Sequence, residues 1–412
     1  MEQLRLERMV HGGLAIARLQ GGRVVLVRGG VPGELVAAEP YESSGVLRAE
    51  VSEVIEASAD RVERPRHPGL DYGHIAYHRQ LELKREVVRD ALGRALSARE
   101  LLPPVSEVTP SPRIWSYRSA IQPAVSSGRL GYRLPGSDRV VELAHDPVAN
   151  EALQTVWKLL SARRLPKGVR EVAMRGNDEG EVLLALVATS PQRTLLEFAH
   201  ELVREGVTGV SHARFDARGR FRGGSSRLAG ARRIDQRYGR FDVTVTVSSF
   251  AQPNPSAASR LYLRLSEIAG AGDKATELFA GSGIIAFHLA ARFGSVAAVE
   301  IDRGSVQRGA EDARRLGIDN VSFVRADARE ARFEKGSDLI AVDPPRSGLS
   351  RQLREEIGRS AARRLLYVSC DPATWARDVA HLRQLGWRLD LVEPFDFYPH
   401  THHVELLSHL SR

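Results

Sequence analysis

The stretch that decides the fold is Ala275-Thr276-Glu277-Leu278-Phe279-Ala280-Gly281-Ser282-Gly283. Its apolar half, 275–279, predicts a buried strand, and the glycines that follow predict a turn into a helix. Glycine lets a backbone pass close to a ligand, and the first amides of a helix attract anionic groups. The turn has neither the GxGxxG of a dinucleotide site nor the Gly-Lys-Ser/Thr of a P-loop. We therefore predict a ligand-binding turn in an α/β sheet.

The C-terminal part of the chain repeats this alternation of strand and helix. Short apolar runs stand at 296–299, 321–324, 339–342 and 365–368, with helical segments at 303–316 and 374–385. Buried strands that alternate with helices are typical of a parallel, doubly wound sheet. The last two runs, 387–392 and 404–410, have no helix between them. We therefore expect the sheet to end in a hairpin.

Acidic residues stand where the second and third of these strands end. Glu300 closes the second strand, where an acid can accept both hydroxyls of a ribose. Asp327 closes the third strand, where its carboxylate can accept the amino group of adenine. With the glycine turn, these acids resemble the S-adenosylmethionine site of the Rossmann-like methyltransferases. Exposed strand-end acids without a ligand are the alternative for either residue alone.

The single cysteine of the chain, Cys370, ends the fifth strand. Asp371 suits the N-cap and Pro372 the first position of the helix that follows. A helix N-terminus lowers the pKa of a thiol below its usual value of about 8.5, although the charge of Asp371 opposes this. We predict that Cys370 is a nucleophile rather than an inert core residue. Asp343, followed by two prolines, ends the fourth strand at the same catalytic edge.

Near the C-terminus, Glu405 follows three closely spaced histidines, His400, His402 and His403. The histidine spacing matches no common tetrahedral zinc set, so we expect no metal. Glu405 lies in a strand-like run. Burial near the site would raise its pKa and suit it to proton transfer.

The first 247 residues are organised differently. Short strand-like runs and Gly-rich turns in residues 1–57 predict a small β-barrel of OB type, which often holds nucleic acid but can be purely structural. A Pro/His/Arg-rich connection at 58–75 leads to a helix at 78–96. Residues 113–247 mix strands with glycines and suit an α+β domain. Their Arg- and Gly-rich part, 214–240, could contact phosphates or form a solvated loop.

The bulk properties fit a multidomain protein with a polyanionic partner. A chain of 412 residues is too long for one compact core. The net charge of +8 and the pI near 9.8 favour RNA or DNA, although an Arg-rich genome would also raise them. The sequence has no apolar run of about 18 residues and no signal-peptide core, so we expect a cytoplasmic protein without a membrane partner. One cysteine excludes an internal disulfide.

Five motifs occur in the order found in the RNA uracil-5-methyltransferases, a family that modifies transfer RNA or large-subunit ribosomal RNA. They are Phe250-Ala251-Gln252-Pro253-Asn254, the 277–283 turn, Asp343-Pro344-Pro345-Arg346, Ser369-Cys370-Asp371-Pro372-Ala373-Thr374 and Pro399-His400-Thr401-His402-His403-Val404-Glu405. The resemblance covers the whole chain. It implies an α/β, Rossmann-like methyltransferase domain with a mostly parallel seven-stranded sheet (77–112 and 248–412), an RNA-binding, OB-like TRAM β-barrel (1–57) and an inserted α+β central domain (58–76 and 113–247).

The resemblance also implies residue roles. Cys370 adds to C6 of the target uracil, C5 takes the methyl group of S-adenosylmethionine, and Glu405 removes the C5 proton. Asp343 binds the uracil edge or supports the methyl donor. Cofactor-binding residues are Gln252, Glu277, Phe279, Gly281, Gly283, Glu300, Asp327 and Asp343. This chemistry is consistent, because C5 of uracil is a poor nucleophile until a thiolate adds at C6.

The sequence departs from the family pattern at the iron–sulfur cluster that many members carry. The four cysteine positions are occupied by Arg61, His67, Leu70 and Asp146, so we expect no cluster. We expect instead that His67 and Asp146 bridge the same two segments by a hydrogen bond or an ion pair. A smaller departure is Asp371, where the family often has asparagine.

Two other classes of function stay open. A DNA cytosine-5-methyltransferase also uses a cysteine, but its usual Pro-Cys pair is missing, because Ser369 precedes Cys370. An RNA-binding protein with a decayed active site is disfavoured, because Cys370, Glu405 and the cofactor acids are all present. Among RNAs, the layout of the chain favours ribosomal over transfer RNA. A monomer is the default expectation.

Overall fold

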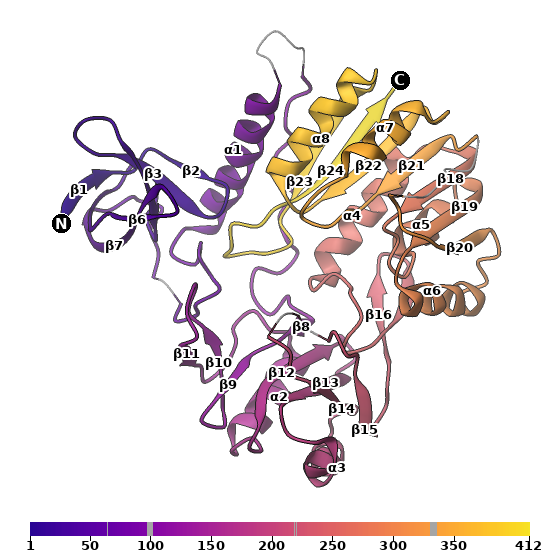
Figure 1. Cartoon of the computed structure of the whole chain (residues 1–412), viewed down its shortest axis with the longest axis horizontal. Helices are drawn as coiled ribbons and strands as arrows, with labels where there is room; N and C mark the ends of the chain where they lie inside the picture. The colour runs from indigo at the N-terminus through magenta and orange to yellow at the C-terminus, as the bar shows by residue number, and fades with distance from the viewer. Residues whose placement is uncertain (64, 97–101, 218, 220, 330–335) are drawn as a thin grey trace.

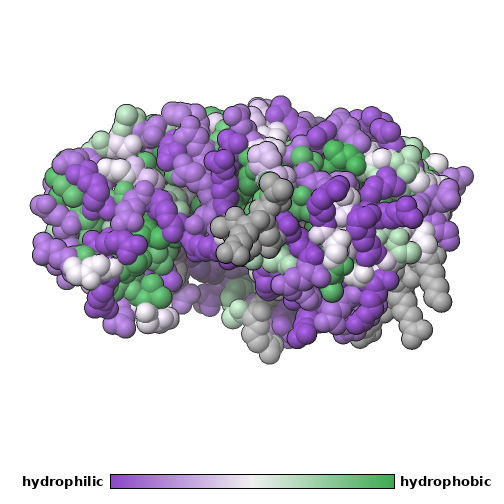
Figure 2. Space-filling view, turned by 90° about the horizontal axis from the view of Figure 1, so that it is seen from above, coloured by the Kyte–Doolittle hydropathy of each residue, from purple (hydrophilic) through white to green (hydrophobic). Residues whose placement is uncertain are grey.

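A computed structural model describes residues 1–412 except 64, 97–101, 218, 220 and 330–335. The described chain forms an N-terminal, a central and a C-terminal sheet, which occupy three separate regions in Figure 1, and one further hairpin. The face shown in Figure 2 is mainly hydrophilic, with scattered apolar groups and a hollow between its two ends. Among the described residues, no helix is long and apolar enough to cross a membrane.

The N-terminal sheet has seven strands in the order β1-β5-β7-β4-β3-β2, with β6 paired to β7. In β4 every second residue, Val25 and Val27, is buried, because alternate side chains of a strand point to opposite faces. The strands are β1 (Glu2–Arg5), β2 (Arg8–Val10), β3 (Leu14–Arg18), β4 (Val24–Arg28), β5 (Leu35–Ala38), β6 (Tyr41–Ser43) and β7 (Val46–Glu56).

Helix α1 (Tyr77–Ala95) lies between the N-terminal sheet and the C-terminal domain (Figure 1). Leu83 and Val87 belong to the core of the N-terminal sheet, whereas Val88 and Leu92 belong to the core of the C-terminal domain. Two apolar stripes on one helix thus tie the two domains together. The sequence predicted this helix at 78–96.

The central domain is an eight-stranded sheet covered by two helices. Helix α2 (Glu151–Ser161) buries Val156 and Trp157 against this sheet, in keeping with its strongly one-sided apolar pattern. The other elements are β8 (Ala120–Ile121), β9 (Ala124–Ser126), β10 (Arg129–Arg133), β11 (Val140–Glu142), β12 (Val169–Gly176), β13 (Val182–Ala188), the short 3₁₀ helix η1 (Gln192–Leu195), α3 (Leu196–Arg204), β14 (Gly209–Arg214) and β15 (Ser226–Gly230).

A separate hairpin, β16 (Ile234–Tyr238) and β17 (Phe241–Val245), follows the central sheet. The sequence division at 247 places it in the central domain. In the structure, the backbone N–H and the hydroxyl of Thr244 donate to the buried carboxylate of Asp312 on α6 (Arg303–Arg315) at 2.8 and 2.7 Å. The hairpin therefore packs on the C-terminal domain. The sequence division at 247 did not predict this contact.

The C-terminal sheet has seven strands in the order β20-β19-β18-β21-β22-β24-β23, and β24 runs against both of its neighbours. The hairpin expected at the end of the sheet is β23–β24. The elements are α4 (Pro255–Ile268), β18 (Gly272–Leu278), α5 (Ile284–Ala290), β19 (Phe293–Glu300), α6 (Arg303–Arg315), β20 (Val321–Arg325), β21 (Leu339–Val342), α7 (Arg351–Arg359), β22 (Arg364–Ser369), α8 (Pro372–Gln384), β23 (Arg388–Phe395) and β24 (Glu405–Ser411).

The register of this sheet brings distant segments to one edge. Leu278 pairs with Val342, and Val342 with Tyr367, so β18, β21 and β22 end close together. Ser369 pairs with Leu406. Because β24 is antiparallel, its first residue, rather than its last, lies at the edge where the parallel strands end.

Candidate active site

A cavity of about 840 Å³ opens at this edge of the C-terminal sheet. Most of the residues singled out from the sequence line it together, although they come from six separate segments. These are Gln252, Glu277, Phe279, Gly281, Glu300, Asp343, Cys370 and Glu405. Gly283 and Asp327 are not among its lining residues.

The glycine turn forms one wall of the cavity. Phe279 and Gly281 have φ angles of +61° and +55°, a region that glycine enters easily and phenylalanine does not. Glu300 holds the turn, because its Oε2 accepts the Gly281 N–H at 2.9 Å and its Oε1 the Asp302 N–H at 2.8 Å. A Cβ added to Gly281 would meet no atom within 4 Å, so the turn borders open space there.

Gly283 has a packing role instead of a lining role. It is the N-cap of α5 with φ +79°, and a Cβ there would come within 2.6 Å of the Phe323 ring. A buried acid holds the first turn of this helix, since Glu277 Oε2 accepts the Ala286 N–H at 2.8 Å. Burial raises the pKa of Glu277, and the nearby carboxylates of Asp343 and Glu300 raise it further.

Asp343 lies at the floor of the cavity, directly after β21. The surrounding protein raises the pKa of its carboxyl group from the usual 3.8 to about 7. Pro344 follows and fixes the extended backbone at this point. At neutral pH, Asp343 is therefore poised between its neutral and charged forms.

Cys370 is half-buried and joins β22 to α8. The predicted helix start is present: Asp371 caps α8 by accepting the Thr374 N–H at 2.8 Å, and Pro372 is the first helical residue. The expected low pKa of the thiol is wrong for the unliganded protein. Burial, followed by the nearby Glu405 and Asp343 carboxylates, raises the pKa of Cys370 to about 12, and only Arg346 opposes them. The field of one helix end is weaker than these effects.

Glu405, the first residue of β24, is fully buried beside the cavity. Among the described residues, no group forms a hydrogen bond with its Oε2 atom. Burial raises the pKa of Glu405, Asp343 raises it further, and Arg346 lowers it. A buried carboxyl group with an unpaired oxygen is available to exchange a proton with a bound ligand.

Further side chains that the sequence did not single out as site residues also line the cavity, and five of them are large polar or charged groups. Arg346 follows the two prolines, and its positive charge opposes the rise in the pKa values of Cys370 and Glu405. The others are Tyr262 on α4, Arg308 on α6, Tyr398 and His403. Arg346 and His403 stand inside motifs quoted above, and the motifs were the only signal for them. Tyr262 and Arg308 carry no sequence signal, because only helix packing brings them here.

Asp327 lies beside the main cavity and not in it. Its carboxylate accepts hydrogen bonds from the Arg329 guanidinium, and this contact lowers its pKa. It lines an adjoining cavity of about 540 Å³, and Phe279 lines both cavities. The sequence placed Asp327 at the correct edge of the sheet but could not show this separation.

The three histidines have separate partners. The His400 ring stacks on Trp115 with centroids 3.7 Å apart, His402 pairs with Asp71, and His403 lines the cavity. Within the described part of the chain, no group of three or more His, Cys, Asp or Glu residues is arranged to hold a metal ion.

Two of the four positions that align with the cysteines of the iron–sulfur cluster, His67 and Asp146, form a polar contact. His67 Nε2 lies 3.6 Å from Asp146 Oδ1, and both side chains are buried. Tyr132 donates to Asp146 Oδ2 at 2.5 Å, and its ring lies against the His67 ring. Leu70 packs nearby with Tyr117 and Val148. Arg61 is elsewhere, in a two-point ion pair with Glu34 of the N-terminal domain.

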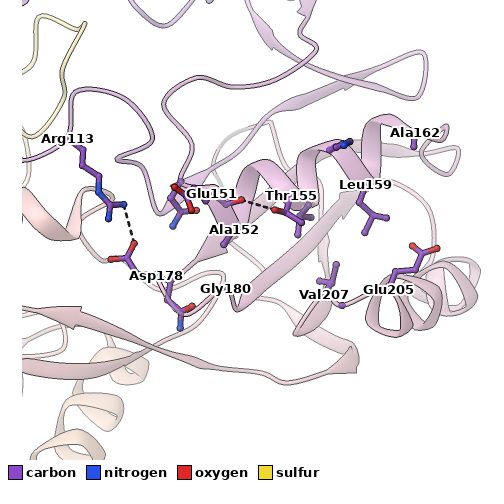
Figure 3. A pocket seen from close by; sticks show the side chains of 15 residues that line it. Arg113, Glu151, Ala152, Thr155, Leu159, Ala162, Asp178, Gly180, Glu205 and Val207 are labelled. Carbon is purple, nitrogen blue, oxygen red and sulfur yellow. Dashed lines mark hydrogen bonds and ion pairs between the residues drawn. The ribbon is translucent and has the colours of Figure 1, made fainter.

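A second cavity, of about 630 Å³, lies in the central domain between α2 and the loops after β12 and α3 (Figure 3). Arg113 and Asp178 form an ion pair of 3.6 Å at one end of it, and Glu205 stands at the other. The carboxylates of its lining are exposed to solvent. The reactive groups therefore gather in the first cavity.

Comparisons with known proteins show the family of the chain. A family model described as tRNA (Uracil-5-)-methyltransferase matches residues 234–412. An uncharacterized RNA methyltransferase of Thermosynechococcus vestitus is 30% identical over 99% of this chain and 97% of its own length. One of Streptomyces coelicolor is 31% identical over 98% and 91%. The chain belongs to the RNA uracil-5-methyltransferase family.

The fold of this RNA uracil-5-methyltransferase family member also has a solved counterpart. The Pyrococcus abyssi tRNA (uracil-54, C5)-methyltransferase, in complex with S-adenosyl-L-homocysteine, superposes with a TM-score of 0.80. It is 24% identical and covers 99% of this chain and 100% of its own. Membership makes the protein an S-adenosylmethionine-dependent enzyme that acts on RNA. The main cavity fits this methyl donor, because Glu300 and the open side of Gly281 border it together.

Proposed function

We propose that the protein methylates C5 of a specific uridine in RNA through a covalent bond between Cys370 and C6 of the base. The observation that carries the proposal is the meeting of the chain's single thiol with a buried carboxyl group, Glu405, in one cavity. Within the described part of the chain, the buried Oε2 atom of Glu405 has no hydrogen-bond partner. The third group, Asp343, has a pKa near neutrality and can hydrogen-bond a base in either protonation state.

The proposed steps follow from these residues. The thiolate of Cys370 adds to C6 of the uracil, and C5 becomes an enolate-like nucleophile. S-adenosylmethionine would supply an activated methyl group: C5 would bond to the methyl carbon as the bond to the sulfonium sulfur breaks, and S-adenosylhomocysteine would leave. Glu405 takes the C5 proton, and the electron pair of that bond expels Cys370 from C6. Asp343 holds the polar edge of the uracil or supports the methyl donor.

The methyl donor would lie along the glycine turn. In this arrangement Glu300 faces the ribose, Gln252 and Glu277 border the methionine end, and Gly281 allows the backbone to approach. Gly283 supports the turn through its packing under Phe323. Because Phe279 lines both neighbouring cavities, the adenine would extend past its ring towards Asp327.

We also propose a division of labour between the domains. The N-terminal sheet, residues 1–57, would be a TRAM-type barrel that binds RNA, and residues 58–76 with 113–247 an inserted α+β domain. The methyltransferase domain would comprise 77–112 and 248–412, joined by the β16–β17 hairpin that packs on α6. The net charge of +8 supports an RNA-binding surface, because it raises the local concentration of polyanions.

Two RNA substrates remain to be separated. We favour a uridine of large-subunit ribosomal RNA. The second candidate is a transfer RNA uridine, which the name of the Pyrococcus abyssi counterpart suggests. In either RNA, the base must leave its stack, which costs least in a loop.

The decisive experiment is intact-protein mass spectrometry after mixing the protein with S-adenosylmethionine and RNA that contains 5-fluorouridine. Fluorine at C5 cannot leave as a proton, so the protein should stay bonded to the RNA. The Cys370→Ala variant, which has no thiol at all, is the control and should form no adduct. Sequencing the trapped RNA from ribosomal and transfer RNA pools would identify the substrate. Bound S-adenosylmethionine without an adduct from any RNA pool would refute the covalent mechanism.

A further inference from the structure

The turn between β2 and β3 of the N-terminal sheet reaches the segment that carries the thiol (Figure 1). His11 Nε2 in this turn lies 3.1 Å from Asp371 Oδ2. The side chain of His11 is 44% exposed and that of Asp371 only 16% exposed. Asp371 directly follows Cys370, so a residue of the N-terminal domain touches the immediate neighbour of the thiol.

The turn is seated closely on the C-terminal domain. Gly12 and Gly13 have φ angles of +93° and +74°, which favour glycine. A Cβ on Gly13 would collide with Asp71 Oδ2 and lie 3.1 Å from the Cβ of His402. Asp71 is itself bonded to His402, whose backbone N–H donates to it at 3.1 Å. The position of His11 is therefore fixed by packing and is not that of a free loop.

Asp371 connects His11 to the wall of the cavity. One carboxylate oxygen, Oδ1, accepts the Thr374 N–H at 2.8 Å, which leaves Oδ2 for His11. The Thr374 hydroxyl donates to the carbonyl oxygen of Arg346 at 3.0 Å. Cys370 and Arg346 both line the cavity. The contact with His11 is therefore made at the start of α8, where Asp371 and Thr374 set the separation between Cys370 and Arg346.

The charge of Asp371 opposes formation of the thiolate. Asp371 is among the groups that raise the pKa of Cys370, and the hydrogen bond from His11 lowers the pKa of Asp371. Other charged or titratable groups around His11 are Asp90 and Arg94 of α1, Arg377 of α8, and His402, whose ring centroid is 6.2 Å away. Asp371 is the group that His11 contacts directly.

We propose that His11 is a positioning residue for the methyl transfer: it holds the Asp371 carboxylate in its capping position and screens its charge from Cys370. The N-terminal domain then completes the nucleophile segment, in addition to any part it plays in RNA binding. This inference rests on the proposed role of Cys370 as the nucleophile.

The test uses the fact that Cys370 is the only cysteine of the chain. Its rate of alkylation by iodoacetamide at pH 7, without RNA, reports the thiolate fraction directly. The His11→Ala variant should react about three- to tenfold more slowly, which corresponds to a rise of about 0.5–1 unit in the thiol pKa. In an Asp371→Asn background, where there is no charge to screen, His11→Ala should change the rate less than about twofold.

A matched control is His78→Ala, which removes a similar contact, 3.0 Å to Asp60, that involves no residue of the thiol segment. It should leave the alkylation rate unchanged. Equal slowing by His11→Ala in both backgrounds would mean that the turn merely supports the fold, and no slowing in either would also overturn the proposal. Because alkylation needs no RNA, either result is distinct from failure of the 5-fluorouridine adduct, which would refute the proposed function itself.

Discussion

Lys84 and Asp396 form a fully buried ion pair that joins α1 to the loop before Glu405. The Lys84 ammonium donates to Asp396 Oδ1 at 2.6 Å and to the Tyr398 carbonyl oxygen at 3.1 Å, and neither charged side chain is exposed. Gln80, one turn earlier, accepts the His400 N–H at 2.8 Å. Lys84 and Asp396 are 312 residues apart in the sequence. Their contact nevertheless fixes the segment that ends at Glu405 to helix α1.

Replacing Lys84 by methionine should lower the free energy of unfolding by about 3–5 kcal/mol, because it leaves a buried carboxylate without its cation. Urea denaturation measures this loss. The Lys158→Met variant on the exposed side of α2 is the control and should change stability by less than about 0.5 kcal/mol. Asp396→Asn added to Lys84→Met should restore part of the loss. A Lys84→Met protein as stable as the parent would contradict the burial of the pair.

Replacing Glu405 by glutamine should slow turnover by about 10²–10⁴-fold, because the amide cannot take the C5 proton. Addition of Cys370 does not need this carboxylate, so a covalent complex with ordinary RNA should accumulate and be visible on a denaturing gel. The control is Glu393→Gln on β23, which breaks an ion pair with Arg264 of α4; neither residue lines the cavity. Normal turnover by Glu405→Gln would assign the proton to another base.

Stability should depend on pH through Asp343. Its pKa is raised from 3.8 to about 7 in the folded protein, so the folded state keeps a proton that the unfolded state loses above about pH 4. The free energy of unfolding therefore falls as pH rises from about 4 to 7, by up to about 4 kcal/mol from this group.

The Asp343→Asn variant lacks this titration and isolates it. Its stability relative to the parent should increase between pH 4 and pH 8, measured by urea denaturation at each pH, while its methyl transfer activity falls. Glu277 and Glu405, whose pKa values the Asp343 carboxylate raises, also titrate in the parent, so the difference between the two proteins reports Asp343 together with its effect on these two groups. A difference that is constant with pH would show that Asp343 titrates normally.

Replacing His67 by alanine should destabilise the protein by about 1–3 kcal/mol. Asp146 would lose the buried imidazole that lies 3.6 Å from its Oδ1, and Tyr132 would lose the ring it packs against. The melting temperature of His67→Ala can be compared with that of His145→Ala, which alters an exposed histidine in the same segment. Equal melting temperatures would mean that the His67–Asp146 contact does not replace the stabilising role of a cluster.

Local sequence signals located most of the site. Asp371 and Pro372 predicted the start of α8, and the glycines predicted the turn at 279–283. The direction of the Cys370 pKa shift was predicted wrongly, because it depends on burial and on Glu405 and Asp343, which come from other strands. The separation of Asp327 from the cavity likewise depends on its contact with Arg329 and on the packing of Phe279.

The sequence by itself determined the C-terminal strands and helices, the glycine turn and the residue types at the ends of the strands. These follow from apolar spacing, glycine conformation and helix capping, which act between residues a few positions apart. Only the tertiary structure decided that Cys370 meets Glu405, that Lys84 holds the loop before it, and that His11 reaches Asp371. These contacts depend on the antiparallel register of β24 and on domain packing. Long-range contacts of this kind depend on how the whole chain packs, so no pattern within a single segment predicts them.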